Sequence, residues 1–406
     1  MNLSFYIAKR YLFSKKSHNA INIISLVAVC GVAIATLATV CTMSVFNGFQ
    51  GMVFEMFSSF DPDLKITPAK GKVFDPTTDV FLEIKSFPEI DIVSETLEDN
   101  ILLKYKERQV PAVMKGVSDN FETLTQINDI LFDGEFILKD EVNNFATLGI
   151  GIASNLGVSA NSVLPLDIYA PKRNAPVNLS NPISSFSIDH AYIGALFMIS
   201  QPVYDDNYMI VSIDFTRELF DYEKEVSALE IKLKDKVNIK SVQKKIQQII
   251  GEDYIVKDLF QQQEAAFKMM SIEKWVTFLM LCFILLIATF NVIGSLSMLI
   301  VEKQADIITL RNLGADNKLI SRIFLFEGWM ISALGAIIGI FFGVLICLGQ
   351  QYFGWLQLGG SGAFAVDAYP VQIEIRDLIL VLATVLFIGF LAALYPVLYL
   401  SKKWAK

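Results

Sequence analysis

The residues that most often carry chemistry are few in this chain and lie far apart. The 406 residues include only two histidines and four cysteines, at His18, His190, Cys30, Cys41, Cys282 and Cys347. None of them belongs to a C-x-x-C or H-E-x-x-H pattern, and Gly71-Lys72 is followed by Val73 instead of the Ser or Thr of a phosphate-binding loop. The sequence therefore predicts a non-catalytic chain that has no metal site and binds no cofactor itself.

The segment from Glu302 to Ala315 has the spacing of a short amphipathic helix. Its apolar face would carry Ile307, Leu310 and Gly314, and its other face would carry Lys303, Asp306 and Arg311. Gly314 is placed as a C-terminal cap, and Asp316 can cap the next helix. Such a helix offers a surface to a cytoplasmic partner, although a plain connector lying on lipid head groups has the same pattern.

Four apolar stretches must position this segment. Each reaches the roughly 20 residues that span a bilayer, and together they cover 21–46, 275–301, 323–348 and 378–400. Charged residues make up 19% of the chain, below the roughly 25% of soluble proteins, so lipid is part of its solvent. Gly335, Gly339 and Gly343 recur every four residues, which favours close helix packing within the chain or between subunits. Glu327 is expected to snorkel to the cytoplasmic interface, which leaves no ion path through the spans.

Basic residues outside the four stretches predict the orientation. Lys and Arg are concentrated in 1–20, 302–322 and 401–406, whereas 349–377 has Arg376 as its only basic residue. By the positive-inside rule the first three segments are cytoplasmic, and 349–377 and the long segment 47–273 lie outside. Residues 1–20 are predicted to form an interfacial helix on the inner leaflet or a simple extension of the first apolar stretch.

The long segment 47–273 is predicted to be an α+β domain in two parts. It has 21 Lys and Arg against 35 Asp and Glu, a formal net charge of −14, which argues against nucleic acid as a partner. Residue spacing predicts strands at 63–67, 100–105, 109–114, 228–234 and 254–256, and helices at 79–87 and 239–250. The βαβ-like ends leave about 118–226 as an insertion. Within it, residues 170–187 are rich in Pro, Asn and Ser and predict a long exposed loop.

Several motifs resemble those of one family. Glu302–Ala315 resembles the coupling-helix stretch of FtsX-like permeases, the type VII ABC transporter group, and is more similar to the lipoprotein-releasing LolC/LolE family than to other members. Further stretches resemble the same family at Ser44–Gln50, Gly149–Ala153, Leu156–Val158, Thr289–Ile293, Ala368–Val371 and Leu394–Pro396. The chain departs from the family at Asn161-Ser162, where a Gly-Asp pair is usual. The resemblance covers nearly the whole chain.

The resemblance implies a fold and a set of partners. The fold would be four transmembrane helices with a large α+β periplasmic domain, MacB-like in its core, inserted between helices 1 and 2. The chain would lie in the inner membrane of a diderm bacterium beside a second permease subunit, either a paralogue or a second copy. A LolD-like ABC ATPase dimer would hydrolyse ATP with Mg²⁺ in the cytoplasm. The permease would extract lipoproteins from the outer leaflet and pass them to a LolA-like periplasmic chaperone.

Three groups of site residues follow from this resemblance. The ATPase would contact Lys303, Asp306, Ile307, Leu310, Arg311, Leu313 and Gly314. Acyl chains would lie against flexible or large apolar side chains at Met43, Val45, Phe46, Phe49, Met52, Met269, Met270, Ile272 and Trp275. A hook that captures the chaperone would carry Lys172, Arg173, Pro176, Val177, Leu179 and Pro182, although an ordinary loop has the same composition.

Three alternative functions stay open. A MacB-like export permease would need an outer-membrane channel, and it usually has an ATPase fused before its first span, where only residues 1–20 stand here. An FtsX-like regulator of a periplasmic hydrolase would have a much smaller external domain than residues 47–273. A sensor or scaffold without transport would not need the coupling segment.

Overall fold

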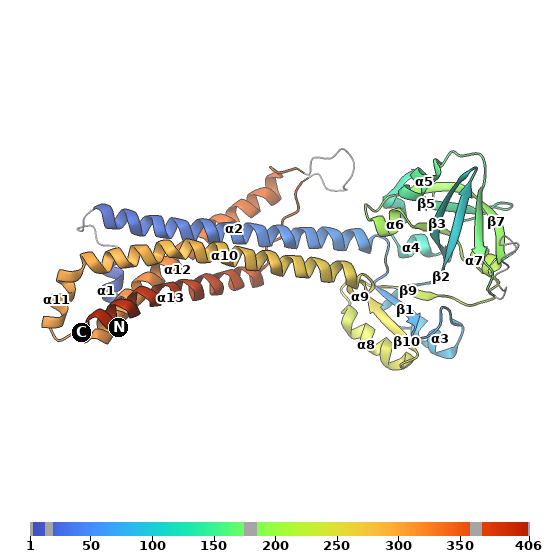
Figure 1. Ribbon diagram of the computed structural model, residues 1–406. Coiled ribbons are helices and arrows are strands. Elements are labelled where there is room, and N and C mark those ends of the chain that lie inside the picture. Colours follow the sequence, from blue (N-terminus) through green and yellow to red (C-terminus); the bar gives the residue numbers. More distant parts are fainter. Residues whose placement is uncertain (1–2, 13–18, 174–184, 358–367, 405–406) are drawn as a thin grey trace. The chain divides into compact units, whose positions relative to one another are not determined.

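The computed structural model describes residues 3–12, 19–173, 185–357 and 368–404 (Figure 1). The chain divides into two compact units. The helical unit contains residues 1–52 and 268–406, and the sheet domain contains residues 53–267.

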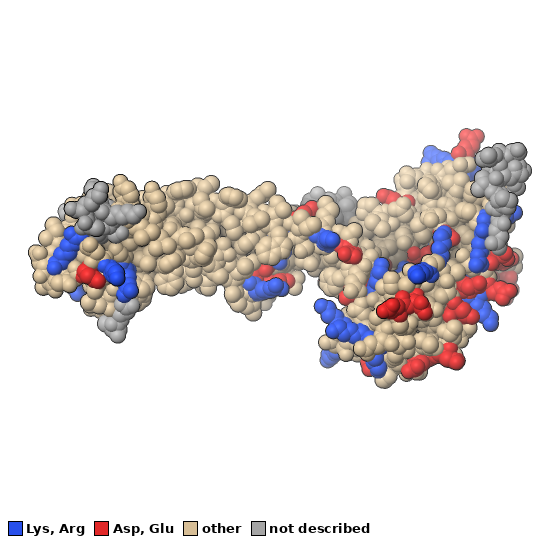
Figure 2. Space-filling view, turned by 60° about the horizontal axis from the view of Figure 1, so that its bottom comes forward, with Lys and Arg blue, Asp and Glu red and all other residues tan. Residues whose placement is uncertain are grey.

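The described part of the helical unit is built from long apolar helices. Its helices are α1 Leu3–Leu12, α2 Asn19–Ser58, α10 Glu264–Glu302, α11 Gln304–Asn312, α12 Asn317–Phe353 and α13 Ile375–Trp404. Of these, α2, α10, α12 and α13 are long and apolar enough to cross a membrane. On the face seen in Figure 2, charged side chains gather toward the ends of this unit and are absent from its middle. The unit therefore has the surface expected of a protein that spans a bilayer.

All four of these helices are longer than the apolar stretches that predicted them, and α2 and α10 extend furthest beyond them at one end. The helix α2 continues past Phe46 to Ser58, and α10 begins at Glu264, ahead of Trp275. The added segments contain Ala, Met, Glu and Lys, which are good helix formers, and no Pro, so the helices continue beyond their apolar cores. Each helix thereby extends into the residues of the sheet domain.

The glycine ladder of α12 packs against α2. A Cβ atom at Gly339 would lie 2.5 Å from the carbonyl oxygen of Ala33, and one at Gly335 would lie 2.8 Å from the Val32 side chain. Real Cβ atoms do not approach this closely, so glycine is what allows the two helices to touch. Of the two alternatives left open by the sequence, the ladder serves packing within the chain.

The expectation that Glu327 snorkels to the membrane surface is wrong. Its side chain is fully buried, and neither carboxylate oxygen has a hydrogen-bond partner within the described residues. Position 327 lies on the same face of α12 as the buried residues Ile320, Phe324 and Ile331, because residues three to four apart share one side of a helix. The carboxyl group is therefore enclosed by the chain's own helices.

The described residues of the sheet domain form one ten-stranded mixed sheet with short helices. Its strands are β1 Leu64–Pro68, β2 Ile90–Tyr105, β3 Arg108–Val117, β4 Leu131–Gly134, β5 Phe145–Gly149, β6 Leu166–Pro171, β7 Phe186–Phe197, β8 Tyr208–Ser212, β9 Ala228–Leu233 and β10 Tyr254–Asp258. Its helical segments are α3 Asp79–Lys85, α4 Phe121–Leu124, η1 Ile127–Ile130, α5 Ile150–Leu156, α6 Pro202–Asp205, α7 Ile213–Phe220, α8 Ile239–Ile250 and α9 Leu259–Gln262. The order is β10-β1-β9-β2-β3-β8-β5-β7-β4, and β6 pairs with β2 and β7.

Local sequence patterns predicted the two ends of this domain. The strands expected at 100–105 and 109–114 pair as β2 and β3, and the helix expected at 239–250 is α8, ending before Gly251. Among the described residues of this domain, many of the buried hydrophobic side chains form two clusters, and Tyr222 packs against both. One contains Ile66 and Ile231 beneath α8, and the other contains Leu148 and Ile168 from the middle of the domain. The second cluster also includes residues of β2 and β3, so the limits 118–226 for an insertion stay a prediction.

Candidate functional site

The predicted coupling segment contains the helix α11, and the turn that follows this helix has a cap on each side. Gly314 has φ of +93°, and its N–H donates to the carbonyl oxygen of Arg311 at 2.8 Å. The carboxylate of Asp316 accepts from the N–H of Leu319 at 2.9 Å and caps α12. Both predicted caps are therefore confirmed, and they fix a short turn between α11 and α12.

The predicted contact residues of α11 differ in exposure. Ile307 is buried in the core of the helical unit, whereas Leu313 is 80% exposed. Lys303 forms an ion pair with Asp306 at 3.4 Å and lies 5.2 Å from the centre of the Tyr11 ring. Leu310 and Arg311 are half-buried. Ile307 thus anchors the helix, and Ile308, which the sequence analysis did not select, is exposed, as Leu313 is.

A ring of polar side chains links three helices at the end of the unit predicted to face outward. The Nζ atom of Lys274 on α10 lies 2.9 Å from Asp377 Oδ2 at the start of α13 and donates to Asn47 Oδ1 on α2 at 2.6 Å. The Nδ2 atom of Asn47 donates to Asp377 Oδ2 at 2.8 Å. We call these three residues the helix ring. Each charged group has a partner, which reduces the free-energy cost of burying it between apolar helices.

Two residues of the helix ring, Lys274 and Asp377, lie on the wall of a pocket of about 430 Å³. The apolar side chains that line the pocket are Met43, Trp275, Phe278, Ile379, Leu380 and Ala383. The polar side chains that line it are Gln50, Ser271, Lys274, Glu374, Arg376 and Asp377. We call this cavity the helix pocket. It combines an apolar wall with a charged rim, as sites for amphipathic ligands do.

The residues predicted to hold acyl chains are placed in three different ways. Met43 and Trp275 line the helix pocket. Met269, Ile272 and Trp275 are each more than half exposed and follow one another at a spacing of three along α10, which puts them on one side of the helix. The remaining predicted positions are buried or half-buried at Val45, Phe46, Phe49, Met52 and Met270. The sequence analysis missed Lys274 and Asp377, although both stand at the edge of an apolar stretch.

Two of the predicted hook residues, Lys172 and Arg173, are described, and they directly follow β6. Strands β6 and β7 pair antiparallel, and the N–H of Lys172 donates to the carbonyl oxygen of Ser185 at 2.9 Å. The guanidinium of Arg173 lies 4.6 Å from the centre of the Tyr222 ring. The other predicted hook residues, Pro176, Val177, Leu179 and Pro182, lie outside the described residues.

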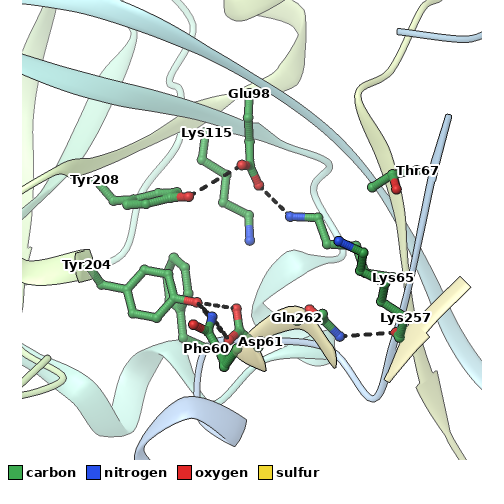
Figure 3. A pocket seen from close by; sticks show the side chains of 11 residues that line it. Phe60, Asp61, Lys65, Thr67, Glu98, Lys115, Tyr204, Tyr208, Lys257 and Gln262 are labelled. Carbon is green, nitrogen blue, oxygen red and sulfur yellow. Dashed lines mark hydrogen bonds and ion pairs between the residues drawn. The ribbon is translucent and has the colours of Figure 1, made fainter. Parts of the chain in front are cut away.

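A second polar cluster lies inside the sheet domain and was not predicted (Figure 3). Lys115 on β3 forms an ion pair with Glu230 on β9 at 2.9 Å, and Lys65 on β1 forms one with Glu98 on β2 at 2.9 Å. Lys65 also lies 3.6 Å from Glu230, which joins the two pairs. Burial raises the pKa of Glu98, but Lys65 and Lys115 outweigh it and lower the pKa below its ordinary value. We call these four residues the sheet network.

Beside the sheet network, one tyrosine joins the two points where the chain enters and leaves the domain. The hydroxyl of Tyr204 donates to Asp61 at 2.6 Å, and Gln263 Nε2 donates to Asp61 Oδ2 at 2.8 Å. Figure 3 shows Tyr204 and Asp61 on the wall of a pocket of about 260 Å³, across from Lys115. Burial raises the pKa of Asp61, and the Tyr204 hydroxyl and the charge of Lys115 offset this only in part.

Two protein-family models match the chain. The FtsX-like permease C-terminal model matches residues 278–404, and the MacB-like periplasmic core domain model matches residues 25–249.

Curated relatives carry the name of lipoprotein-releasing system transmembrane proteins. LolC from Neisseria meningitidis is 27% identical over 261 residues, which are 61% of this chain and 60% of that protein. LolE from Haemophilus influenzae is 22% identical over 306 residues, which are 72% of this chain and 70% of that protein.

Among solved structures, the periplasmic region of MacB from Actinobacillus actinomycetemcomitans is similar over 53% of this chain and 98% of that one. The identity is 9% and the TM-score is 0.37, too low to establish more than the likeness itself.

Proposed function

Because this chain belongs to the FtsX-like permease family and carries a MacB-like periplasmic core domain, we propose that it is the permease subunit of an ABC transporter that releases lipoproteins from a membrane. The relatives named for lipoprotein release support the choice of cargo. The structural observation that carries it is the exposed apolar row Met269, Ile272 and Trp275 on α10, which we call the α10 stripe.

The α10 stripe needs an apolar partner. Its first two residues lie ahead of the predicted span, where a helix facing only water would not carry exposed large apolar side chains in a row. The acyl chains of a lipoprotein drawn out of the outer leaflet are such a partner. Methionine suits this task because its flexible thioether adapts to chains of different shape.

Several partners follow from the proposal. A second permease subunit faces the α10 stripe and completes the cavity that holds the acyl chains. A cytoplasmic LolD-like ATPase dimer binds ATP and Mg²⁺ and contacts α11 through Ile308, Leu310 and Leu313. A LolA-like periplasmic chaperone accepts the cargo at the β6–β7 hairpin. The chain lies in the inner membrane with both termini in the cytoplasm and the sheet domain in the periplasm, and it performs no catalysis itself.

The cargo is tested by photo-crosslinking in cells. A crosslinking amino acid at Met269 or Ile272 should capture acylated protein. Phe341 on α12 is exposed to a similar degree and lies away from the stripe, so a crosslinker there should capture lipid only. Equal lipid labelling at all three positions without a lipoprotein adduct would contradict the proposal and favour an export or regulatory permease.

The ATPase contact is tested by charge at the exposed end of α11. Leu313→Asp should prevent co-purification of the ATPase, because an aspartate in an apolar contact must lose its hydration. Asn312→Asp adds the same charge at the neighbouring exposed position without removing an apolar side chain, so its complex should stay intact. Full assembly of the Leu313→Asp complex would show that the ATPase binds elsewhere.

A further inference from the structure

The helix pocket has two kinds of wall that meet at the helix ring. Its apolar side chains come from α2, α10 and α13, and its rim carries four formal charges, two positive and two negative. The helices that form it are tied together by the hydrogen bonds of Asn47, Lys274 and Asp377, so the pocket is held open by the chain's own contacts. A volume of about 430 Å³ falls in the range of small-molecule sites.

Two of the four charged groups on the rim are already paired with each other. Lys274 and Asp377 neutralise each other at 2.9 Å, and Asn47 takes a second N–H of Lys274. An ammonium group has three N–H donors, so one donor of Lys274 is left for a ligand. Glu374 and Arg376 are exposed on the rim, and within the described residues neither has an ion-pair partner. The rim therefore offers an ammonium N–H, a guanidinium and a carboxylate at the mouth of an apolar cavity.

We infer that the helix pocket binds a zwitterionic phospholipid whose head group carries both a phosphate and a primary ammonium. The phosphate takes the guanidinium of Arg376 and the remaining N–H of Lys274, because guanidinium and ammonium groups are the phosphate ligands of proteins. The head-group ammonium pairs with Glu374. The upper part of one acyl chain lies against Trp275, Phe278 and Leu380.

Charge balance selects this class of lipid over two others. The rim is neutral overall, so a neutral zwitterion fills it without leaving an unpaired charge. A phospholipid with a glycerol head group has the phosphate but no cation for Glu374. A phospholipid with a choline head group has a cation that cannot donate a hydrogen bond, so it satisfies Glu374 less well. The acylated cysteine of a lipoprotein has no phosphate, so the head-group contacts at Arg376 and Lys274 are separate from the proposed release of lipoproteins, although Trp275 belongs both to the helix pocket and to the α10 stripe.

The experiment measures lipid retention by the full-length chain. The purified protein is stripped in detergent and exposed to vesicles of phosphatidylcholine that contain equal small fractions of phosphatidylethanolamine and phosphatidylglycerol, and the retained lipids are counted by native mass spectrometry. The wild type should retain phosphatidylethanolamine in preference to phosphatidylglycerol and phosphatidylcholine. Arg376→Gln should lower the retention of both phosphate lipids in the minor fractions about tenfold, the effect of losing one charge-assisted contact.

The variant that decides the question is Glu374→Gln. It should remove the preference for phosphatidylethanolamine while leaving phosphatidylglycerol as well retained as before or better. Lys318→Gln, an exposed charge on α12 away from the pocket, is the matched control and should retain lipids as the wild type does. Equal retention of the three lipids by the wild type, or an unchanged preference in Glu374→Gln, would overturn the inference.

A separate arm distinguishes this site from the cargo. A triacylated lipopeptide should bind the Arg376→Gln chain as well as the wild type, because it has no phosphate to lose. If the lipid preference is found and crosslinkers on the α10 stripe capture no lipoprotein, the phospholipid site stands and the proposed function fails. If lipopeptide binding falls together with phosphatidylethanolamine binding in Arg376→Gln, the pocket belongs to the cargo and the inference is wrong.

Discussion

The helix ring and the sheet network contain ion pairs of the same length in different surroundings. Lys274–Asp377 and Lys115–Glu230 both measure 2.9 Å. The side chains of the first pair are 21% and 11% exposed, whereas those of the second are 2% and 0% exposed. Distance alone therefore says little about the energy of such a pair, because the cost of removing a partner depends on whether water can replace it.

The two clusters also differ in what they hold together. The helix ring joins α2, α10 and α13. No backbone hydrogen bonds align packed helices, so their position along one another depends on side-chain contacts. The sheet network joins β1, β2, β3 and β9, whose alignment the backbone ladder between β2, β3 and β9 already fixes. In the helical unit the polar contact selects the arrangement, and in the sheet domain the arrangement imposes the polar contact.

The largest effect is expected for Lys115→Met. It leaves the buried Glu230 carboxylate with Lys65, 3.6 Å away, as its only counter-charge among the described residues, and removing one partner of a buried pair costs about 3–5 kcal/mol in comparable proteins. Glu230 Oε2 has no hydrogen-bond partner within the described residues, so no hydrogen bond at that oxygen compensates for the lost pair. The measurement is hydrogen exchange of the β3 and β9 amides in the full-length protein.

The double variant Lys115→Met/Glu230→Gln is the control for Lys115→Met. It removes both charges and should recover most of the lost protection. A double variant that is as unstable as the single one would show that the contact of the Lys115 ammonium with the Phe60 ring, and not the ion pair, stabilises the domain.

A smaller loss is expected for Asp377→Asn in the helix ring. The amide oxygen can still accept from Asn47, but the ion pair with Lys274 is lost, and partial exposure to water reduces the cost to about 1–3 kcal/mol. Thermal unfolding in detergent measures it. Glu374→Gln removes a neighbouring exposed carboxylate and should change stability by about 0.5 kcal/mol or less. Equal shifts for the two variants would mean that the ring does not tie the helices together.

The sequence predicted the elements and missed both clusters for the same physical reason. The strand at 228–234 and the helix at 239–250 follow from spacing within a few residues. Glu230 stands on the polar side of that alternation and would be placed in water, but β9 is an inner strand between β1 and β2, and the residue is fully buried. Such burial depends on strands far away in the chain, which a local pattern does not contain.

The helix ring could be predicted only in part. Asn47, Lys274 and Asp377 each stand at the end of an apolar stretch, where polar residues are ordinary. The orientation predicted by the positive-inside rule puts all three residues at the same end of the helical unit, and so at a similar depth in the membrane. Which of them touch is fixed by the packing of α2, α10 and α13, and the Gly ladder reports only the contact of α12 with α2.

Two carboxyl groups of one pocket in the sheet domain are expected to change the stability in opposite directions as the pH rises. Burial raises the pKa of Asp61, so its contribution to stability is full below the unfolded value near about pH 4 and is lost as the pH rises through the folded value. Glu98 behaves in the opposite way because, against its burial, Lys65 and Lys115 lower its pKa. Its contribution is present above the unfolded pKa and is lost as the pH falls through the folded one.

Variants of the two carboxyl groups distinguish these opposite effects of pH on stability. As the pH rises from about 4 to 7, Asp61→Asn should gain stability relative to the wild type. As the pH rises from about 3 to 5, Glu98→Gln should lose stability relative to the wild type. Unfolding midpoints of the full-length protein across this range measure both. Slopes of the same sign would mean that one of the two carboxyl groups is not in the environment described.

The smallest effect is expected where the same distance occurs at the surface. Lys72 and Asp99 also lie 2.9 Å apart, but the lysine is 70% exposed. Water and salt screen such a pair, and holding the long lysine side chain in place costs entropy, so Lys72→Met should change stability by about 0.5 kcal/mol or less. The measurement is the unfolding midpoint at low and high salt, compared with that of Lys115→Met under the same conditions. A loss as large as that of Lys115→Met would mean that distance, and not burial, sets the energy of ion pairs in this chain.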